Sequence, residues 1–276
     1  MLSLQADVKQ FSLTFAVLCA VCAACLAGPE VLPSGKEMKQ VAPAPSPCPN
    51  WSGFYAGISG GYKFADTDVN LDLIGGWNQS FDIIPQHTIE PKGSGDFLDT
   101  SGAELGGLIG YNFQWNNWVF GLEGAGNYLW LRESDTTGIF PVFFPRSGRN
   151  VDYSINTAFR THYLATAGGR IGYTFCRLMP FVTGGVAFGD IDFEQEVIQH
   201  AGFQEGGSKS DTEVGWMVGA GLEYVLTEHW HLRTQYEYID LSSESFRHHT
   251  TAAGFTGITR IELQEHNASF AIVYKF

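Results

Sequence analysis

The residues best placed to act as a nucleophile and a base are Ser269 and His266, near the end of the chain. A hydrolase needs these two groups within hydrogen-bond reach of each other. Three positions apart on a strand, they would point to opposite faces. The sequence also holds no G-x-S-x-G, H-E-x-x-H or P-loop motif. We therefore expect no catalytic residues, and a lipid-modifying hydrolase is the weakest of the functions considered.

Two histidine pairs have spacings that a metal ion could use. His229 and His231 are two positions apart, and His248 is followed directly by His249. A structural zinc site needs four ligands, and these pairs have no neighbouring cysteine and only Glu228 as a close carboxylate. We interpret these histidines as solvent-exposed surface residues and expect neither a metal site nor a cofactor.

The charge balance argues against nucleic acid as a partner. The chain has 16 Lys and Arg against 29 Asp and Glu, a formal net charge of −13, whereas binding to phosphates needs a basic face. Charged residues make up only 16% of the chain, while aromatic residues reach 14% and glycines number 33. This composition favours a β-protein whose outer surface meets something less polar than water.

The N-terminal part predicts two segments that precede the folded region. Residues 1–27 resemble a secretory signal peptide, because Lys9 is followed by an uncharged apolar run that ends in small residues at Ala27. A retained anchor helix and a lipoprotein acylated at Cys25 stay open as alternatives. Residues 28–50 hold six of the 11 prolines and predict an extended periplasmic spacer.

From residue 51 to residue 276 the sequence divides into eight segments in which bulky and small residues alternate. They are Gly53–Asp66, Ser101–Gln114, Trp118–Glu133, Ala158–Phe175, Met179–Phe193, Thr212–Leu226, Trp230–Leu241 and Glu262–Phe276. No helix is expected between them. Short connections alternate with four long ones, near 67–100, 134–157, 194–211 and 242–261. We predict an all-β fold, an eight-stranded antiparallel up-and-down transmembrane β-barrel over 51–276, with short periplasmic turns and long extracellular loops.

The bulky face of these segments is predicted to point outward. In the sixth segment Trp216 and Val218 alternate with Gly219 and Gly221. The interior of an eight-stranded barrel is only wide enough for side chains to fill it, so the small face fits inside. The aromatic face then needs lipid around it. The pattern of Met179–Phe193 does not settle which way its side chains point.

This assignment puts eight charged residues in the lumen. They are Lys63, Glu104, Glu123, Arg170, Glu223, Arg233, Glu237 and Lys275. Four cations and four anions in a narrow, low-dielectric interior must pair or be hydrated. We expect a mutually dependent ion-pair network that plugs the barrel, because aqueous channels belong to barrels about twice this size. A small porin with charged walls is the alternative.

The second long loop is the candidate contact surface. It holds Phe140, Phe143 and Phe144, followed by Arg146 and Arg149. An exposed aromatic tip beside arginines could bind a host or surface ligand, or the phosphates of lipopolysaccharide. The same residues could equally fold onto the mouth of their own barrel.

Cys48 and Cys176 are the cysteines that would remain after removal of a signal peptide. In the predicted topology both lie at the periplasmic rim, in an oxidising compartment. The few residues between Cys48 and the first strand are long enough to cross the barrel mouth, at about 3.3 Å per residue. We predict a disulfide that pins the proline-rich segment under the barrel; the alternatives are two free thiols or pairing with another chain.

Several strand motifs carry a resemblance to a known family. They are Trp51–Gly57, Gly107–Phe113, Gly168–Tyr173, Pro180–Ala187, Gly219–Tyr224 and Phe270–Phe276. These motifs are similar to strands of the small outer-membrane β-barrel family of Gram-negative bacteria, the surface antigens and opacity-type porin-like proteins. The loops and the Cys48-Pro49 element have no counterpart in it that we identify.

The resemblance implies a location, partners and a role. It implies the bacterial outer membrane, with its lipid and lipopolysaccharide as surroundings, and a structural and surface-recognition role of the adhesin or antigen type. It also implies recognition of the closing aromatic row by the outer-membrane assembly machinery. In this sequence the row consists of Phe270, Ile272, Tyr274 and Phe276.

Overall fold

The computed structural model describes residues 48–75, 83–96, 100–144, 148–200, 202–247, 249–250 and 255–276. The predicted signal peptide, the spacer up to residue 47, Arg146 and His248 lie outside these ranges. No helix in the described part of the chain is long and apolar enough to cross a membrane.

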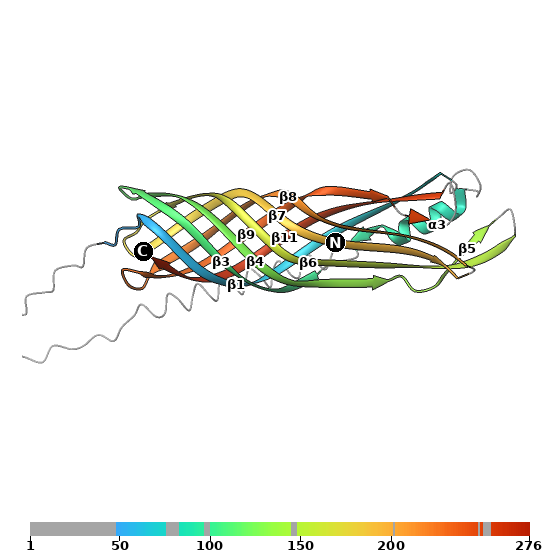
Figure 1. Cartoon of the computed structure of the whole chain (residues 1–276), viewed down its shortest axis with the longest axis horizontal. Coiled ribbons are helices and arrows are strands. Elements are labelled where there is room, and N and C mark those ends of the chain that lie inside the picture. The colour runs from blue at the N-terminus through green and yellow to red at the C-terminus, as the bar shows by residue number, and fades with distance from the viewer. Residues whose placement is uncertain are drawn as a thin grey trace, which may run out of the picture. The chain divides into compact units, whose positions relative to one another are not determined.

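Eight antiparallel strands form a closed ring (Figure 1). In chain order they are β1 (Gly53–Gly75), β3 (Thr100–Trp115), β4 (Trp118–Thr136), β6 (Arg149–Tyr173), β7 (Leu178–Gln199), β8 (Phe203–Val225), β9 (Trp230–Arg247) and β11 (Phe255–Lys275). Each strand pairs with the next one in this order, and the pairing of β1 with β11 closes the ring. The predicted eight-stranded up-and-down barrel is confirmed.

Short elements are added at one end of the ring. They are α3 (Ile83–Gly93), β2 (Gly95–Asp96), β5 (Phe140–Phe144) and β10 (His249–Thr250), which pair with or pack against β1, β6 and β8. Figure 1 shows α3 and β5 at the end opposite the C-terminus. We call this the distal end, and the end with the turns 116–117, 174–177 and 226–229 the short-turn end.

The four long loops are shorter than predicted, because most of the residues assigned to them belong to strands. β1 runs on to Gly75, β6 begins at Arg149, and β9 continues to Arg247. Along β1 the buried positions change from Lys63 to Val69, Leu71 and Leu73, while the exposed ones change from apolar residues to aspartates. The alternation therefore continues into the distal half with its polarity reversed, so that acidic residues made these strands look like loops.

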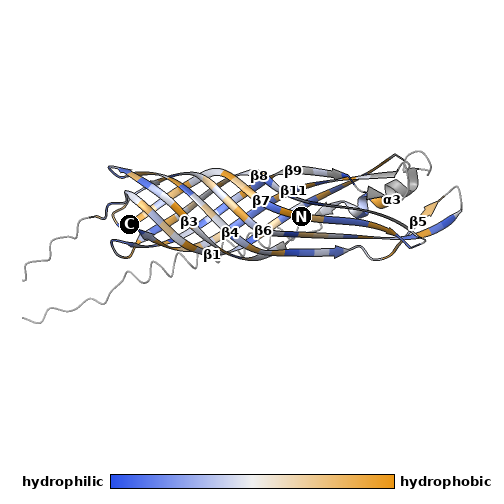
Figure 2. Ribbon diagram, viewed as in Figure 1, coloured by the Kyte–Doolittle hydropathy of each residue, from blue (hydrophilic) through white to orange (hydrophobic). Residues whose placement is uncertain are grey.

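The reversal divides the barrel wall into two halves with different surroundings. In the half near the short turns, apolar side chains such as Ile58, Leu122 and Val182 are exposed on the outer face. In the distal half the outer face carries exposed acids such as Asp68, while Phe159 and other apolar residues are buried. Figure 2 shows hydrophobic segments around the half that holds the C-terminus and hydrophilic stretches toward α3 and β5.

Outward aromatic residues lie in two zones that border the apolar half. Near the short turns Trp118 packs edge-on against Tyr173, with ring centroids 5.2 Å apart, and Trp230 packs similarly on Tyr274. Toward the distal half, Tyr128 packs against Trp130 at 4.9 Å. Such paired zones are typical of aromatic girdles at the two faces of a bilayer.

The helix α3 contradicts the expectation that no helix interrupts the strands. It is only 11 residues long and contains Pro91, so its sequence has little helical signal. Tertiary contacts hold it instead: Ile89 is fully buried, the backbone N–H of Leu73 donates to Glu90 at 2.8 Å, and Gln195 donates to the carbonyl of Gly93 at 3.0 Å. The helix thereby lies against the distal ends of the strands.

Strand β7 settles the one orientation that the sequence left open. Met179, Phe181 and Thr183 are buried in the interior, whereas Val182 and Val186 are exposed. Two large side chains thus point inward near the short-turn end, where the sequence suggested a small inner face. They fit because inward glycines lie beside them; a Cβ at Gly221 would lie 2.6 Å from the ring of Phe181.

Candidate functional site

The first group of lumen charges, which we call the arginine cluster, consists of Arg170, Arg233, Glu123 and Glu223. Arg233 contacts Glu123 at 2.6 Å and Glu223 at 2.9 Å. Arg170 contacts Glu223 at 2.8 Å and Glu123 at 3.4 Å. Both arginines are almost fully buried, so each carboxylate bridges two cations that have little access to water.

Aromatic and histidine side chains complete the arginine cluster. Tyr55 donates its hydroxyl to Glu123 at 2.7 Å, and a ring nitrogen of His231 lies 2.8 Å from Glu223. Arg170 stacks over the ring of Phe181, 4.3 Å from its centroid. The interpretation of His231 as an exposed surface histidine is wrong, because it is 3% exposed. Its alternation with Arg233 on one strand would have placed it inside.

The second group, which we call the lysine cluster, lies further toward the distal end. Lys63 contacts Glu265 at 2.9 Å and Glu104 more loosely at 4.0 Å. Glu237 accepts a hydrogen bond from the side-chain amide of Asn267 at 3.2 Å. Glu265 is not among the predicted lumen residues, although it alternates with Asn267 on the inner face of β11, so that strand periodicity alone predicts its position.

Lys275 does not join either cluster, contrary to the prediction. It lies at the last position of β11, and its ammonium group donates to the backbone carbonyl of Asn50. At the strand end a long side chain can reach out of the lumen to the chain segment that crosses beneath it.

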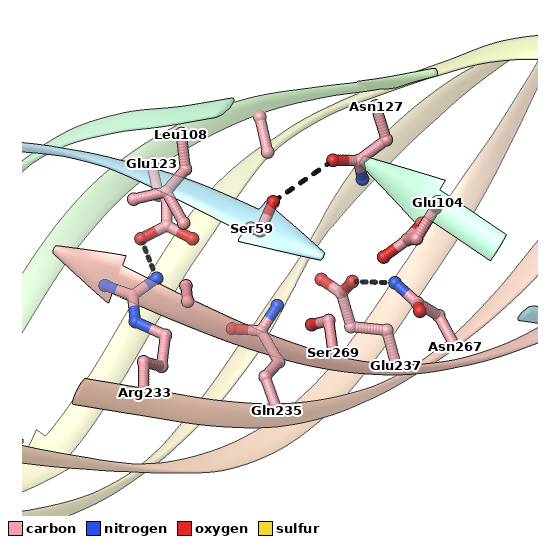
Figure 3. A pocket seen from close by; sticks show the side chains of 12 residues that line it. Ser59, Glu104, Leu108, Glu123, Asn127, Arg233, Gln235, Glu237, Asn267 and Ser269 are labelled. Carbon is pink, nitrogen blue, oxygen red and sulfur yellow. Dashed lines mark hydrogen bonds and ion pairs between the residues drawn. The ribbon is translucent and has the colours of Figure 1, made fainter. Parts of the chain in front are cut away.

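A small cavity separates the two clusters (Figure 3). Glu123 and Arg233 line one side, and Glu104, Glu237 and Asn267 line the other. The space open to the centre of a water-sized sphere is about 20 Å³. Since a single water needs about 10–15 Å³ by this measure, the cavity has room for one or two water molecules.

Apolar layers cover the charged part of the lumen on both sides. Toward the short turns, Trp51, Met179 and Phe181 form a buried cluster with Val119 and Val225. The distal layer is larger and contains, among others, Leu129, Leu131, Leu164, Phe159, Phe193 and Leu241. Beyond it a third cluster includes Ile89 of α3 together with Leu71, Leu73 and Tyr153.

The segment before β1 crosses the short-turn end and is held there. Cys48 and Cys176 form a disulfide bond. Trp51 is 1% exposed, and its indole N–H donates to the carbonyl of Cys176 at 3.2 Å. Its backbone N–H donates to Gln114 at 2.8 Å, and its ring lies edge-on to His231. The indole therefore fills this mouth of the barrel beside the arginine cluster.

The candidate contact residues divide between the two roles that the sequence left open. Phe140 and Phe144 are buried, and both belong to the distal cluster that includes Ile89. Phe143 is 46% exposed, and Arg149 is exposed as well. Two of the three phenylalanines therefore anchor β5 on the barrel, while the other side of the same strand faces outward.

Ser269 and His266, the best-placed candidates for a nucleophile and a base, lie apart. Ser269 lines the lumen cavity, whereas His266 accepts or donates a hydrogen bond with the exposed Tyr236 at 2.6 Å on the outer face. A separate group that sequence inspection missed brings His162 within 3.5 Å of Asp190 and 3.8 Å of Asp192. It depends on a bulge in β6 between Arg160 and Leu164, which no sequence pattern indicates.

The closing row faces outward along β11. Phe270, Ile272 and Phe276 are exposed, with Phe276 the most exposed at 74%. Tyr274 is partly covered by Trp230, and its ring also packs edge-on against Phe276. The row is continuous with the apolar outer face of the half near the short turns.

An antiparallel ring of eight strands, with an apolar outer band between aromatic zones and a filled interior, defines a small transmembrane β-barrel. The model of the outer membrane protein beta-barrel domain family matches residues 41–276. The chain belongs to this family, and its place is the outer membrane.

Similar proteins are named for the same membrane. The chain is 27% identical over 237 residues to the 25 kDa outer-membrane immunogenic protein of Brucella canis, covering 85% of this chain and 84% of that one. It is 28% identical to the 31 kDa outer-membrane immunogenic protein of Brucella melitensis, over 71% and 73% of the two chains. The 22 kDa outer membrane protein of Rhizobium leguminosarum is 25% identical, over 75% and 72%.

Solved structures with a related arrangement have low overall similarity. Neisserial surface protein A matches with a TM-score of 0.38 and 11% identity, over 82% of this chain and 98% of that one. The outer membrane protease OmpT of Escherichia coli matches with a TM-score of 0.43 and 11% identity, over 85% and 99%.

Proposed function

We propose that the protein is a sealed outer-membrane barrel whose role is structural and recognitional, with the distal end displayed at the cell surface. The observation that carries this proposal is the filling of the lumen from Trp51 to Ile89 by alternating apolar and charged layers. A solute would have to displace buried arginine–carboxylate pairs to pass. Short turns of such barrels face the periplasm, which assigns α3 and β5 to the outside.

Support for a recognition role comes from the distal end. Because β5 rests on buried Phe140 and Phe144, its residue Phe143 is held facing outward, and Ile139, just before the strand, is exposed as well. Exposed apolar side chains on a rigid, water-facing element favour contact with a partner surface. The names of the Brucella relatives, which describe immunogenic proteins, are compatible with display at the surface and support a non-enzymatic role.

The test of the sealed barrel is conductance. The purified protein is reconstituted into planar bilayers, and single-channel current is recorded alongside a general porin as the positive control. We expect no stepwise openings from the wild type. The matched control is the double variant Ile139→Ser and Phe143→Ser, because both residues lie outside the lumen. Regular, ohmic openings of the wild type would instead favour the small-porin alternative.

The recognition role has its own test. Intact cells that carry wild-type protein or the double variant Ile139→Ser and Phe143→Ser are compared for binding of antibodies raised against whole cells, and purified protein is compared for binding to lipopolysaccharide aggregates. We expect equal protein levels and a loss of most binding to at least one probe. Unchanged binding to both probes would contradict a role for this tip.

A further inference from the structure

A group of possible metal ligands lies on the outer wall of the barrel, away from the lumen. Nδ1 of His162, on β6, lies 3.5 Å from a carboxylate oxygen of Asp190 and 3.8 Å from one of Asp192, both on β7. One donor atom from each residue lies within 4.8 Å of the other two. We call these three residues the outer triad. It combines an imidazole with two carboxylates, which are ordinary ligands of divalent metal ions in proteins.

The backbone of β6 turns the imidazole toward the two acids. The pairing of β6 with β7 is irregular between Arg160 and Leu164. Thr161 and Leu164 are both buried, whereas the two consecutive residues between them, His162 and Tyr163, lie on the outside. An extra residue on one face is the result of a β-bulge, and bulges commonly re-aim a side chain. The bulge therefore adds His162 to the outer face while Tyr163 keeps its place in the aromatic zone.

The two acids have no close permanent cation. Asp190 and Asp192 are two positions apart on one strand, so their side chains point to the same face. Arg160 lies opposite Asp192 in the register, but within the described residues the ion pairs of both carboxylates are to His162. Two neighbouring carboxylates repel each other unless a positive charge lies nearby. A bound cation would remove that repulsion.

The distances within the outer triad fit the ligands of one ion better than a hydrogen-bonded pair. A hydrogen bond from a nitrogen to an oxygen spans about 2.7–3.2 Å, and neither contact of His162 is that short. In a tetrahedral site with metal–ligand bonds of about 2.0–2.1 Å, two ligand atoms lie about 3.3 Å apart. Small rotations of the half-exposed side chains of Asp190 and Asp192 would close the remaining difference.

The outer triad is open to the surrounding medium. The side chain of His162 is 40% exposed, and those of Asp190 and Asp192 are 23% and 38% exposed. Phe188, the preceding outward residue of β7, is also exposed, so the triad lies where the apolar outer face gives way to acidic residues. An ion reaches it from outside without passing the packed layers of the lumen.

We propose that the outer triad binds one divalent transition-metal ion, with Zn²⁺ as the best-fitting type, through Nδ1 of His162 and one oxygen each of Asp190 and Asp192. Zn²⁺ accepts nitrogen and oxygen ligands in tetrahedral sites, and three protein ligands leave one position for water. Ca²⁺ and Mg²⁺ take oxygen ligands, so the imidazole selects against them. The ion joins β6 to β7 at the bulge. This proposal does not depend on the recognition role.

The experiment measures Zn²⁺ binding and its stoichiometry. Purified full-length protein without an affinity tag, in detergent micelles, is treated with EDTA, dialysed, and titrated calorimetrically with ZnCl₂ in the presence of excess MgCl₂. We expect one Zn²⁺ per chain, bound more tightly than the background binding of exposed histidines such as His229. Magnesium should not compete, because it does not favour an imidazole ligand.

Isosteric variants identify the site. Loss of a residue that only orients a metal ligand costs about 10–100-fold in affinity, so His162→Gln, Asp190→Asn and Asp192→Asn should each weaken Zn²⁺ binding at least tenfold. Glu194→Gln is the matched control, because Glu194 is the next exposed acid on the same face of β7 and its loss changes the charge equally. Tryptophan fluorescence checks that each variant is folded.

Two results would overturn the proposal. If His162→Gln binds Zn²⁺ as tightly as the wild type, His162 and the two acids form an ordinary ion pair and hold no metal. If Glu194→Gln weakens binding as much as Asp192→Asn does, the acidic face of β7 attracts cations in general and the outer triad is not a specific site.

Discussion

Replacing Arg233 with alanine tests whether the lumen charges depend on one another. The guanidinium group is 1% exposed and lies 2.6 Å from Glu123 and 2.9 Å from Glu223. Removing it leaves Arg170 to neutralise both acids, and Arg170 lies 3.4 Å from Glu123. Breaking a buried pair by removing one partner costs about 3–5 kcal/mol. Because the side chain of Glu123 is still 13% exposed and can gain some water, we expect a loss near the lower end of that range.

The assay is equilibrium urea unfolding of the refolded protein in micelles or vesicles, followed by tryptophan fluorescence. We expect the midpoint to fall with an unchanged slope, since the surface exposed on unfolding stays the same. Adding Glu123→Gln to Arg233→Ala removes the stranded charge and should restore part of the loss, with a coupling of about 0.5–3 kcal/mol. Pairing Arg233→Ala with Glu237→Gln is the matched control, because Glu237 belongs to the lysine cluster. If the losses in unfolding free energy of Arg233→Ala and Glu123→Gln simply add in the double variant, the lumen charges do not depend on one another.

Three further predictions concern the ends of the barrel. Alkylation without prior reduction should leave Cys48 and Cys176 unlabelled in protein from outer membranes, as read by mass spectrometry; labelling of both would exclude the disulfide in cells. Trp51→Ala should reduce the free energy of unfolding by about 3–5 kcal/mol in the same urea assay, and an unchanged midpoint would mean that the indole does not seal the mouth. Deleting Phe276 should leave the protein in the periplasm, and cell fractionation that finds normal outer-membrane levels would count against an assembly role.

The part of the fold that could be predicted from the sequence is the half that faces lipid. There the bilayer imposes one rule on every strand, so that residues such as Phe54 and Ile272 must alternate with small or polar ones. The same rule places Arg170 and Arg233 inside, and the structure brings them together. The pattern does not predict which carboxylate each arginine contacts. That pairing depends on the stagger between strands that are far apart in the sequence.

The distal half escaped prediction for a different reason. Beyond Asp66 the outer face meets water and the inner face is apolar, so the alternation has the polarity of a soluble barrel. A pattern search that expects apolar residues on the outer face stops at that point, and it assigns the rest of the strand to a loop. The helix α3 escaped because its position depends on Glu90 and on Gln195 of β7, neither of which is visible as a local signal.

The two halves of the barrel are stabilised in different surroundings, one in lipid and the other in water. Lipid stabilises the outer face near the short turns, so the lumen there can hold charges as long as they are compensated. In water the distal half has no such support and must build its own core, from Leu129 and Phe159 up to Ile89. That core extends to β5 and buries Phe140 beside α3, which fixes the exposed side of the strand relative to the barrel. The packing that fills the distal lumen is thus continuous with the packing that buries Phe140 and Phe144 and leaves Phe143 exposed.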